Sequence, residues 1–190
     1  AFMTAVSGRP GPVVLALPED MLLERVAAED ARAWRKVVAH PDPGSMERLR
    51  TMLAEARRPF VILGGGGWSA SGVQAIRAFV DTHDLPVACG FRRQDLLHNE
   101  HRCYVGDIAI GPNPKLVEAI READLLLAVG TRLSEMTTQG FTLLGVPVPG
   151  VPLVHVHADP EELGRVYQAE LPIQAAPDAI AQALAALPAP

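Results

Sequence analysis

The sequence has little cysteine, no excess of positive charge and no long hydrophobic run. Cys89 and Cys103 are its only cysteines, which favours a reducing compartment and leaves room for at most one isolated disulfide. The formal net charge is −5, and the arginine pairs are too short to form a nucleic-acid surface. No stretch approaches the roughly 18 apolar residues of a membrane helix, and no signal peptide opens the chain. These absences predict a cytoplasmic protein whose partners include neither nucleic acid nor membrane.

The composition is that of a globular domain with attached segments. Hydrophobic residues make up 48% of the 190 residues, enough to bury one core. Residues 1–18 hold a short apolar strand, "GPVVLAL", with no preceding partner, so we interpret them as the tail of a preceding domain. Residues 19–43 are charged and Ala-rich and predict a linker. Residues 44–188 form the predicted domain, and the absence of an initial methionine indicates a piece of a longer protein.

Within that domain, helical and strand patterns alternate. Such alternation predicts right-handed crossovers and a doubly wound, Rossmann-like α/β fold, with a mostly parallel sheet and helices on both faces. A long irregular section is predicted for residues 90–113. The expected helices lie near residues 46–56, 73–80, 114–120, 161–167 and 178–187, and the expected strands near residues 60–63, 85–89, 124–130, 151–159 and 171–175.

Four consecutive glycines follow the first of these strands. Residues 65–70 fit the pattern G-x-G-x-x-A, in which glycines let a phosphate approach a helix N-terminus. The alternative is a tight structural turn, with a positive φ angle at Gly65 or Gly66. The dinucleotide pattern also requires an acidic residue at the end of the second strand, where this sequence has "ACGF". An ordinary NAD site is therefore disfavoured.

Other reactive side chains have a structural interpretation beside the functional one. His155, His157 and Asp159 alternate along one strand, as metal ligands would, but Asp159 also suits a helix cap. The segment "HNEHRC" at residues 98–103 lacks the second ligand cluster that a zinc site needs. Candidate nucleophiles have no identifiable base; these are Cys89, Ser69 and Ser134. We therefore predict no metal site and no catalytic residue in this chain.

Five motifs occur in the order seen in a known family. They are "RPFVILGGGGWSASG", "LPVACGFRRQDLLHNEHRCYVGDIAIGPNPKL", "EADLLLAVGTRLSEMTTQG", "LVHVHADPEELGRVY" and "ELPI". Residues 45–187 thereby resemble the central domain of thiamine-diphosphate-dependent enzymes similar to the acetolactate synthase large subunit. The segment "GRPGPVVLALPEDML" resembles the end of that family's N-terminal, pyrimidine-binding domain.

The resemblance implies a parent enzyme whose catalytic centre lies outside this chain. Family members hold thiamine diphosphate and Mg²⁺ between an N-terminal domain with a catalytic glutamate and a C-terminal domain with a Gly-Asp-Gly motif. The sequence has no Gly-Asp-Gly, and the glutamate is expected ahead of residue 1. The implied parent decarboxylates a 2-oxo acid and joins carbon units as a homo-oligomer, a dimer or tetramer. This chain would be inactive, with the parent's other two domains as its partners.

The resemblance also implies a nucleotide groove. Flavin-containing relatives hold FAD at positions that correspond here to Gly64, Gly65, Gly66, Gly90, Phe91, Arg92, Gly130, Thr131, Arg132 and His157. Relatives usually carry Asp where His157 stands, and "GFRRQD" replaces a small, apolar segment. Whether the groove holds FAD, holds ADP or is empty stays open. The alternative function is a stand-alone nucleotide-binding or sensing module of the same fold.

Overall fold

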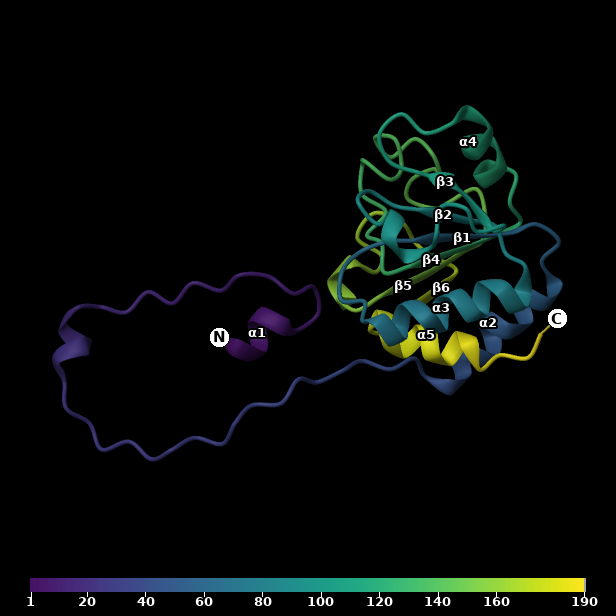
Figure 1. The fold of residues 1–190 in the computed structure, drawn as a ribbon. Coiled ribbons are helices and arrows are strands. Elements are labelled where there is room, and N and C mark those ends of the chain that lie inside the picture. The colour runs from purple at the N-terminus through teal and green to yellow at the C-terminus, as the bar shows by residue number, and fades with distance from the viewer. Residues whose placement is uncertain (190) are drawn as a thin grey trace.

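A computed structural model describes residues 1–189, and their centre is a six-stranded parallel sheet (Figure 1). The strand order is β3-β2-β1-β4-β5-β6, with the reversal between β1 and β4 that defines a doubly wound sheet. The predicted fold class is confirmed. The strands are β1 Pro59–Leu63, β2 Val87–Cys89, β3 Tyr104–Asp107, β4 Leu125–Val129, β5 Leu153–His157 and β6 Leu171–Gln174.

Helices cover both faces of the sheet, but unequally. In Figure 1, α2, α3 and α5 lie together under one face, while α4 lies on the other side near β3. Coil residues 131–151 complete the second face and contribute Leu133, Leu143 and Leu144 to its core. The helices are α1 Phe2–Val6, α2 Pro43–Glu55, α3 Ala70–His83, α4 Pro114–Arg121 and α5 Pro177–Ala185, with 3₁₀ turns η1 Asp20–Leu23, η2 Gln94–Leu96 and η3 Pro160–Glu162. None of the helices in residues 1–189 is long and apolar enough to cross a membrane.

Alternating side chains of the strands build the two cores. In β1, Val61 and Leu63 face the core under α2, α3 and α5, whereas Phe60 and Ile62 face α4. Every residue of β4 is buried, as expected for a central strand of a parallel sheet. The long apolar run at residues 125–129 is therefore the centre of the molecule.

The first 42 residues lie mostly apart from this body. Figure 1 shows them as a long loop that leaves the domain beyond α1 and returns to α2. The strand predicted in "GPVVLAL" is not formed, and Val14 is 90% exposed. That prediction was wrong for this structure because no strand of residues 1–189 pairs with the segment, and an unpaired strand is not stable in water. The assignment of residues 1–18 to a preceding domain and of residues 19–43 to a linker stays a proposal.

Two further elements differ from expectation. The section predicted to be irregular contains β3, whose pairing with β2 shifts register between Val87 and Ala88. Its Gly106 and partly exposed residues hide the period of two on which strand prediction depends. The helix predicted for residues 161–167 is only the turn η3, and Gly164, at φ +80°, interrupts any helical continuation.

Candidate functional site

A groove runs along the carboxyl edge of the sheet, where open α/β sheets bind their ligands. One of its cavities, of about 270 Å³, lies at the ends of β1, β2, β4 and β5. A second cavity, of about 210 Å³, shares Arg9, Gly66, Gly130 and His157 with the first. We call the two together the glycine groove. Nine of the ten candidate residues line the first cavity: Gly64, Gly65, Gly66, Gly90, Phe91, Gly130, Thr131, Arg132 and His157.

Two of the glycines are required by backbone packing alone. Gly65 has φ +69° and Gly130 has φ +74°, both in the left-handed region that favours glycine. A Cβ at Gly65 would lie 1.8 Å from the Gly130 carbonyl oxygen, and a Cβ at Gly130 would lie 2.6 Å from that of Gly64. The turns after β1 and β4 therefore touch through bare backbone, whether or not a ligand is present.

Gly66 is different. It does not have a positive φ, and a Cβ built there meets no atom within 4 Å. The protein does not need glycine at this position for its own packing. The missing side chain leaves open space in the groove, through which a ligand can approach the backbone.

The N-terminus of α3 does not offer the phosphate site that the G-x-G-x-x-A pattern suggests. The Ser69 backbone N–H donates to the Asp178 carboxylate at 2.9 Å. A Cβ at Gly72 would lie 1.8 Å from an oxygen of the same carboxylate. Asp178, from the first turn of α5, thus supplies the negative charge that a helix N-terminus attracts. A bound anion would have to lie elsewhere in the groove.

The two arginines after β2 take different positions. Arg92 does not line either cavity of the glycine groove, and its guanidinium stacks over Phe91 at 4.9 Å from the ring centre. Arg93 donates from Nη1 to the Gly65 carbonyl oxygen and from Nε to Asp95 at 2.9 Å. Arg93 is therefore a support of the glycine turn, a role the sequence did not reveal.

The histidines of β5 hold loops in place. His155 is buried, and its Nε2 lies 2.9 Å from the Thr131 carbonyl oxygen. Burial lowers the pKa of His155, so Nε2–H donates to Thr131 from a neutral ring. The Asp159 backbone N–H lies 3.0 Å from His157 Nδ1. Asp159 also caps η3, accepting from the Glu161 N–H at 3.1 Å, as its position before Pro160 predicted.

Three arginine side chains surround one buried carboxylate beside the groove. Glu162 is 7% exposed, and its Oε1 lies 3.7 Å from Arg9, 3.9 Å from Arg132 and 3.6 Å from Arg165. One carboxylate faces three guanidinium groups, and two of these, Arg9 and Arg132, line the groove. Arg9 could not be predicted from the sequence because it lies far along the chain from the glycines. The fold places Arg9 beside the glycines of the groove.

Of the three candidate nucleophiles, Ser134 lines the glycine groove, whereas Cys89 is buried and Ser69 caps a helix. Burial raises the pKa of Cys89 to about 12, so its thiol stays protonated. The Ser69 side chain caps α3 by accepting from the Gly72 N–H at 3.2 Å. Among residues 1–189, no group of three or more His, Cys, Asp or Glu side chains is arranged to hold a metal ion.

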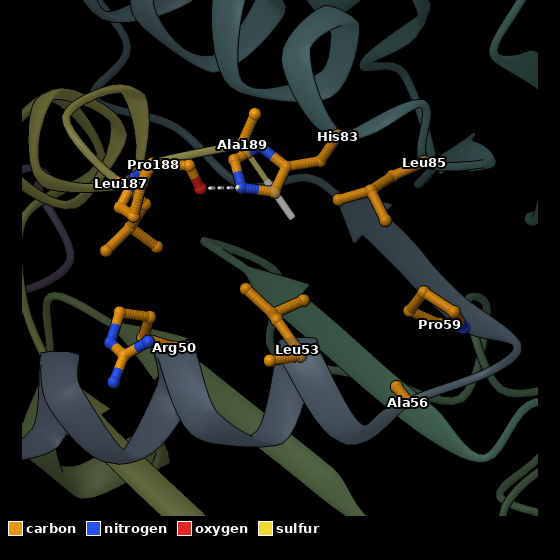
Figure 2. Close-up of a pocket in the computed structure, with 10 residues that line it drawn as sticks. Arg50, Leu53, Ala56, Pro59, His83, Leu85, Leu187, Pro188 and Ala189 are labelled. Atoms are coloured by element: carbon orange, nitrogen blue, oxygen red, sulfur yellow. Dashed lines mark hydrogen bonds between the residues drawn. The ribbon is translucent and has the colours of Figure 1, made fainter.

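A cavity of about 230 Å³ lies at the opposite, amino edge of the sheet (Figure 2). Leu53 points from α2 toward His83, whereas the Arg50 guanidinium donates to Glu47 of the same helix, with Nη2 at 2.6 Å. Both ring nitrogens of His83 face carbonyl oxygens, Nδ1 that of Phe79 and Nε2 that of Pro188, each at 3.1 Å. The imidazole thus lies between the end of α3 and the C-terminal segment, and none of the ten candidate residues lines this cavity.

The chain matches a family model over most of the domain. Residues 46–184 match the model described as "Thiamine pyrophosphate enzyme, central domain". This range covers β1 to β6, and so it includes every strand that builds the glycine groove.

Curated relatives are similar over almost the whole chain. The chain is 31% identical to the acetolactate synthase isozyme 2 large subunit of Escherichia coli, over 97% of this chain and 33% of the relative. It is 28% identical to the acetolactate synthase large subunit of Corynebacterium glutamicum, over 91% of this chain and 28% of that protein. The chain thus spans about a third of the length of these relatives. With the parallel sheet and the matched range, these similarities show that the chain belongs to the family of thiamine pyrophosphate enzyme central domains.

Proposed function

We propose that this chain is the non-catalytic central domain of a larger thiamine-diphosphate-dependent enzyme that decarboxylates a 2-oxo acid and transfers the resulting carbon unit. Thiamine diphosphate supplies the carbanion chemistry in such enzymes. The residues of this chain do not fit that cofactor, since the sequence has no Gly-Asp-Gly and the described residues form no metal-binding cluster. We therefore assign thiamine diphosphate and Mg²⁺ to other domains of the parent. A cytoplasmic, homo-oligomeric parent belongs to the same proposal.

We further propose that the glycine groove binds the diphosphate of an adenine nucleotide, either ADP or the ADP half of FAD. One observation carries this proposal: Arg9 and Arg132 line the groove beside the open space at Gly66, and both share the single Glu162 carboxylate. Guanidinium groups bind phosphate oxygens through charge-assisted hydrogen bonds. The residues present therefore fit a diphosphate.

Binding by this chain alone is expected to be weak. His157 supplies no carboxylate for the ribose hydroxyls, and a lost charged hydrogen bond removes about 1.5 to 3 kcal/mol, or ten- to over a hundredfold in affinity. The purified chain should consequently show no stoichiometric flavin band near 450 nm. A band that co-elutes with the protein would show that His157 is no obstacle.

Calorimetric titration with ADP tests the groove. We expect saturable binding that weakens about tenfold or more in Arg132→Ser, because that variant loses one charged partner of the diphosphate. Arg121→Ser is the matched control, since Arg121 is an exposed arginine at the end of α4, outside the groove. Absence of ADP binding, or equal weakening in both variants, would refute the assignment.

A further inference from the structure

We propose that a second groove, at the amino edge of the sheet, binds a small organic anion with an apolar body. This amino-edge groove has a volume of about 690 Å³, within the range of about 300 to 1,000 Å³ that is typical of small-molecule sites. Its apolar wall is formed by Phe60, Leu85, Val105 and Leu116, and its rim carries Arg57 and Lys115. It lies at the edge of the sheet opposite to the glycine groove and does not depend on the nucleotide proposal.

The apolar wall is firmly built. Phe60 at the start of β1, Leu85 before β2 and Leu116 in α4 are each 5% exposed or less, so the core fixes them on their inner sides. Val105 in β3 stands beside them and is 43% exposed. A ligand that covered Val105 would remove apolar surface from water, worth about 25 cal/mol per Å².

The charged residues at the rim favour a ligand that carries negative charge. Of the two acidic residues that line the groove, Glu122 lies 3.7 Å from Arg58, and Asp84 is bound by Arg102. Among the ion pairs of residues 1–189, none involves the side chain of Arg57 or Lys115, although the Arg57 backbone N–H donates to the Asp124 carboxylate at 2.9 Å. These two side chains favour an anionic head group at the rim.

The neighbouring histidine does not supply this head-group site. His83 lines both this groove and the smaller cavity of Figure 2, together with Pro59 and Leu85. The two ring nitrogens of His83 lie 3.1 Å from the carbonyl oxygens of Phe79 and Pro188, so they are directed at backbone and the ring forms part of the wall. The anion is therefore held by Arg57 and Lys115, and its apolar body lies against Val105 and Leu116.

Three probes with one apolar body and different heads test the proposal on the full chain. They are octanoate, 1-octanol and octylammonium, each titrated while amide NMR shifts are followed. We expect saturable shifts at Val105, Leu116 and Ala119, with octanoate about fivefold tighter than octanol, as one or two exposed ion pairs provide. Octylammonium should bind weakest. Shifts confined to the glycine groove, or no saturation, would overturn the proposal.

Two pairs of surface variants separate charge from apolar contact. Arg57→Ser combined with Lys115→Ser should abolish the preference for octanoate over octanol, whereas Arg121→Ser should leave it unchanged. Val105→Asp should weaken both probes, whereas Ile110→Asp, at a residue 77% exposed outside the groove, should not. Val105→Asp could instead convert a self-associated form of the chain to monomers without changing the affinity for either probe. In that case the groove is an interface between two copies of the chain, and the small-molecule assignment is wrong.

Discussion

The α-carbon of Gly65 lies so close to Gly130 that a Cβ added at Gly65 would be 1.8 Å from the Gly130 carbonyl oxygen. The turns that follow β1 and β4 are thereby locked together. Arg93 adds a hydrogen bond to the Gly65 carbonyl oxygen, and His155 holds Thr131, the next residue after Gly130. The floor of the glycine groove is rigid because these contacts fix it before any ligand arrives.

Gly65→Ala should lower the free energy of unfolding by about 3 kcal/mol or more, because it combines left-handed strain with a backbone clash. Gly66→Ala should change stability little, since its Cβ meets open space. Denaturant melts of the two single variants measure the difference. Equal stability of both variants would show that the two turns are not in contact.

Buried thiols should remain unreactive in the native protein. Burial raises the pKa of Cys89 to about 12 and raises that of Cys103. The neutral thiol is therefore favoured in the folded state, and the stability it contributes is lost as pH rises from about 9 toward 12. We expect neither cysteine to react with Ellman's reagent at pH 8 until the chain unfolds. Cys89→Ala should reduce the alkaline loss of stability, and rapid labelling of native Cys89 would contradict its burial.

His155 should make the fold sensitive to acid. Its pKa is lowered by burial, so the unfolded chain binds the proton first and stability falls as pH drops below about 6.5. Melting temperatures between pH 7.5 and 5.5 should fall less steeply in His155→Gln, whose amide can still donate to Thr131. His40→Gln, at an exposed residue, is the control, and an unchanged slope in His155→Gln would exclude this role.

Thiamine diphosphate should not bind the isolated chain. The residues that hold the cofactor in the family are expected in other domains, and no Gly-Asp-Gly occurs in the sequence. Titration with thiamine diphosphate and Mg²⁺ should give no saturable heat, and pyruvate should not be decarboxylated. Micromolar binding would place a cofactor site within this domain and refute its assignment as non-catalytic.

Much of the fold could be predicted from local patterns. The apolar run of β4 and the helical spacing in α3 reflect burial within one element, which the sequence displays directly. The contact between Gly72 and Asp178 could not be predicted, because its partners lie in different helices far apart in the sequence. Likewise, Arg9 lines the glycine groove although a long loop separates it in sequence from the domain. The residues predicted for the site, Arg132 among them, lie in turns that follow strands, whereas Arg9 and Glu162 are brought beside it by tertiary contacts.

The pairing of β1 with β4 has a consequence for the order in which the chain folds. Phe60 pairs with Leu126, and β2, β3 and α4 all lie between them in sequence. The central ladder therefore closes a large loop, and such nonlocal pairing slows folding. During synthesis, β1 would be an uncovered edge strand until β4 emerged, open to pairing with other chains. The strands that are synthesised first, β1 to β3, are therefore the ones that need protection from aggregation until β4 has been made.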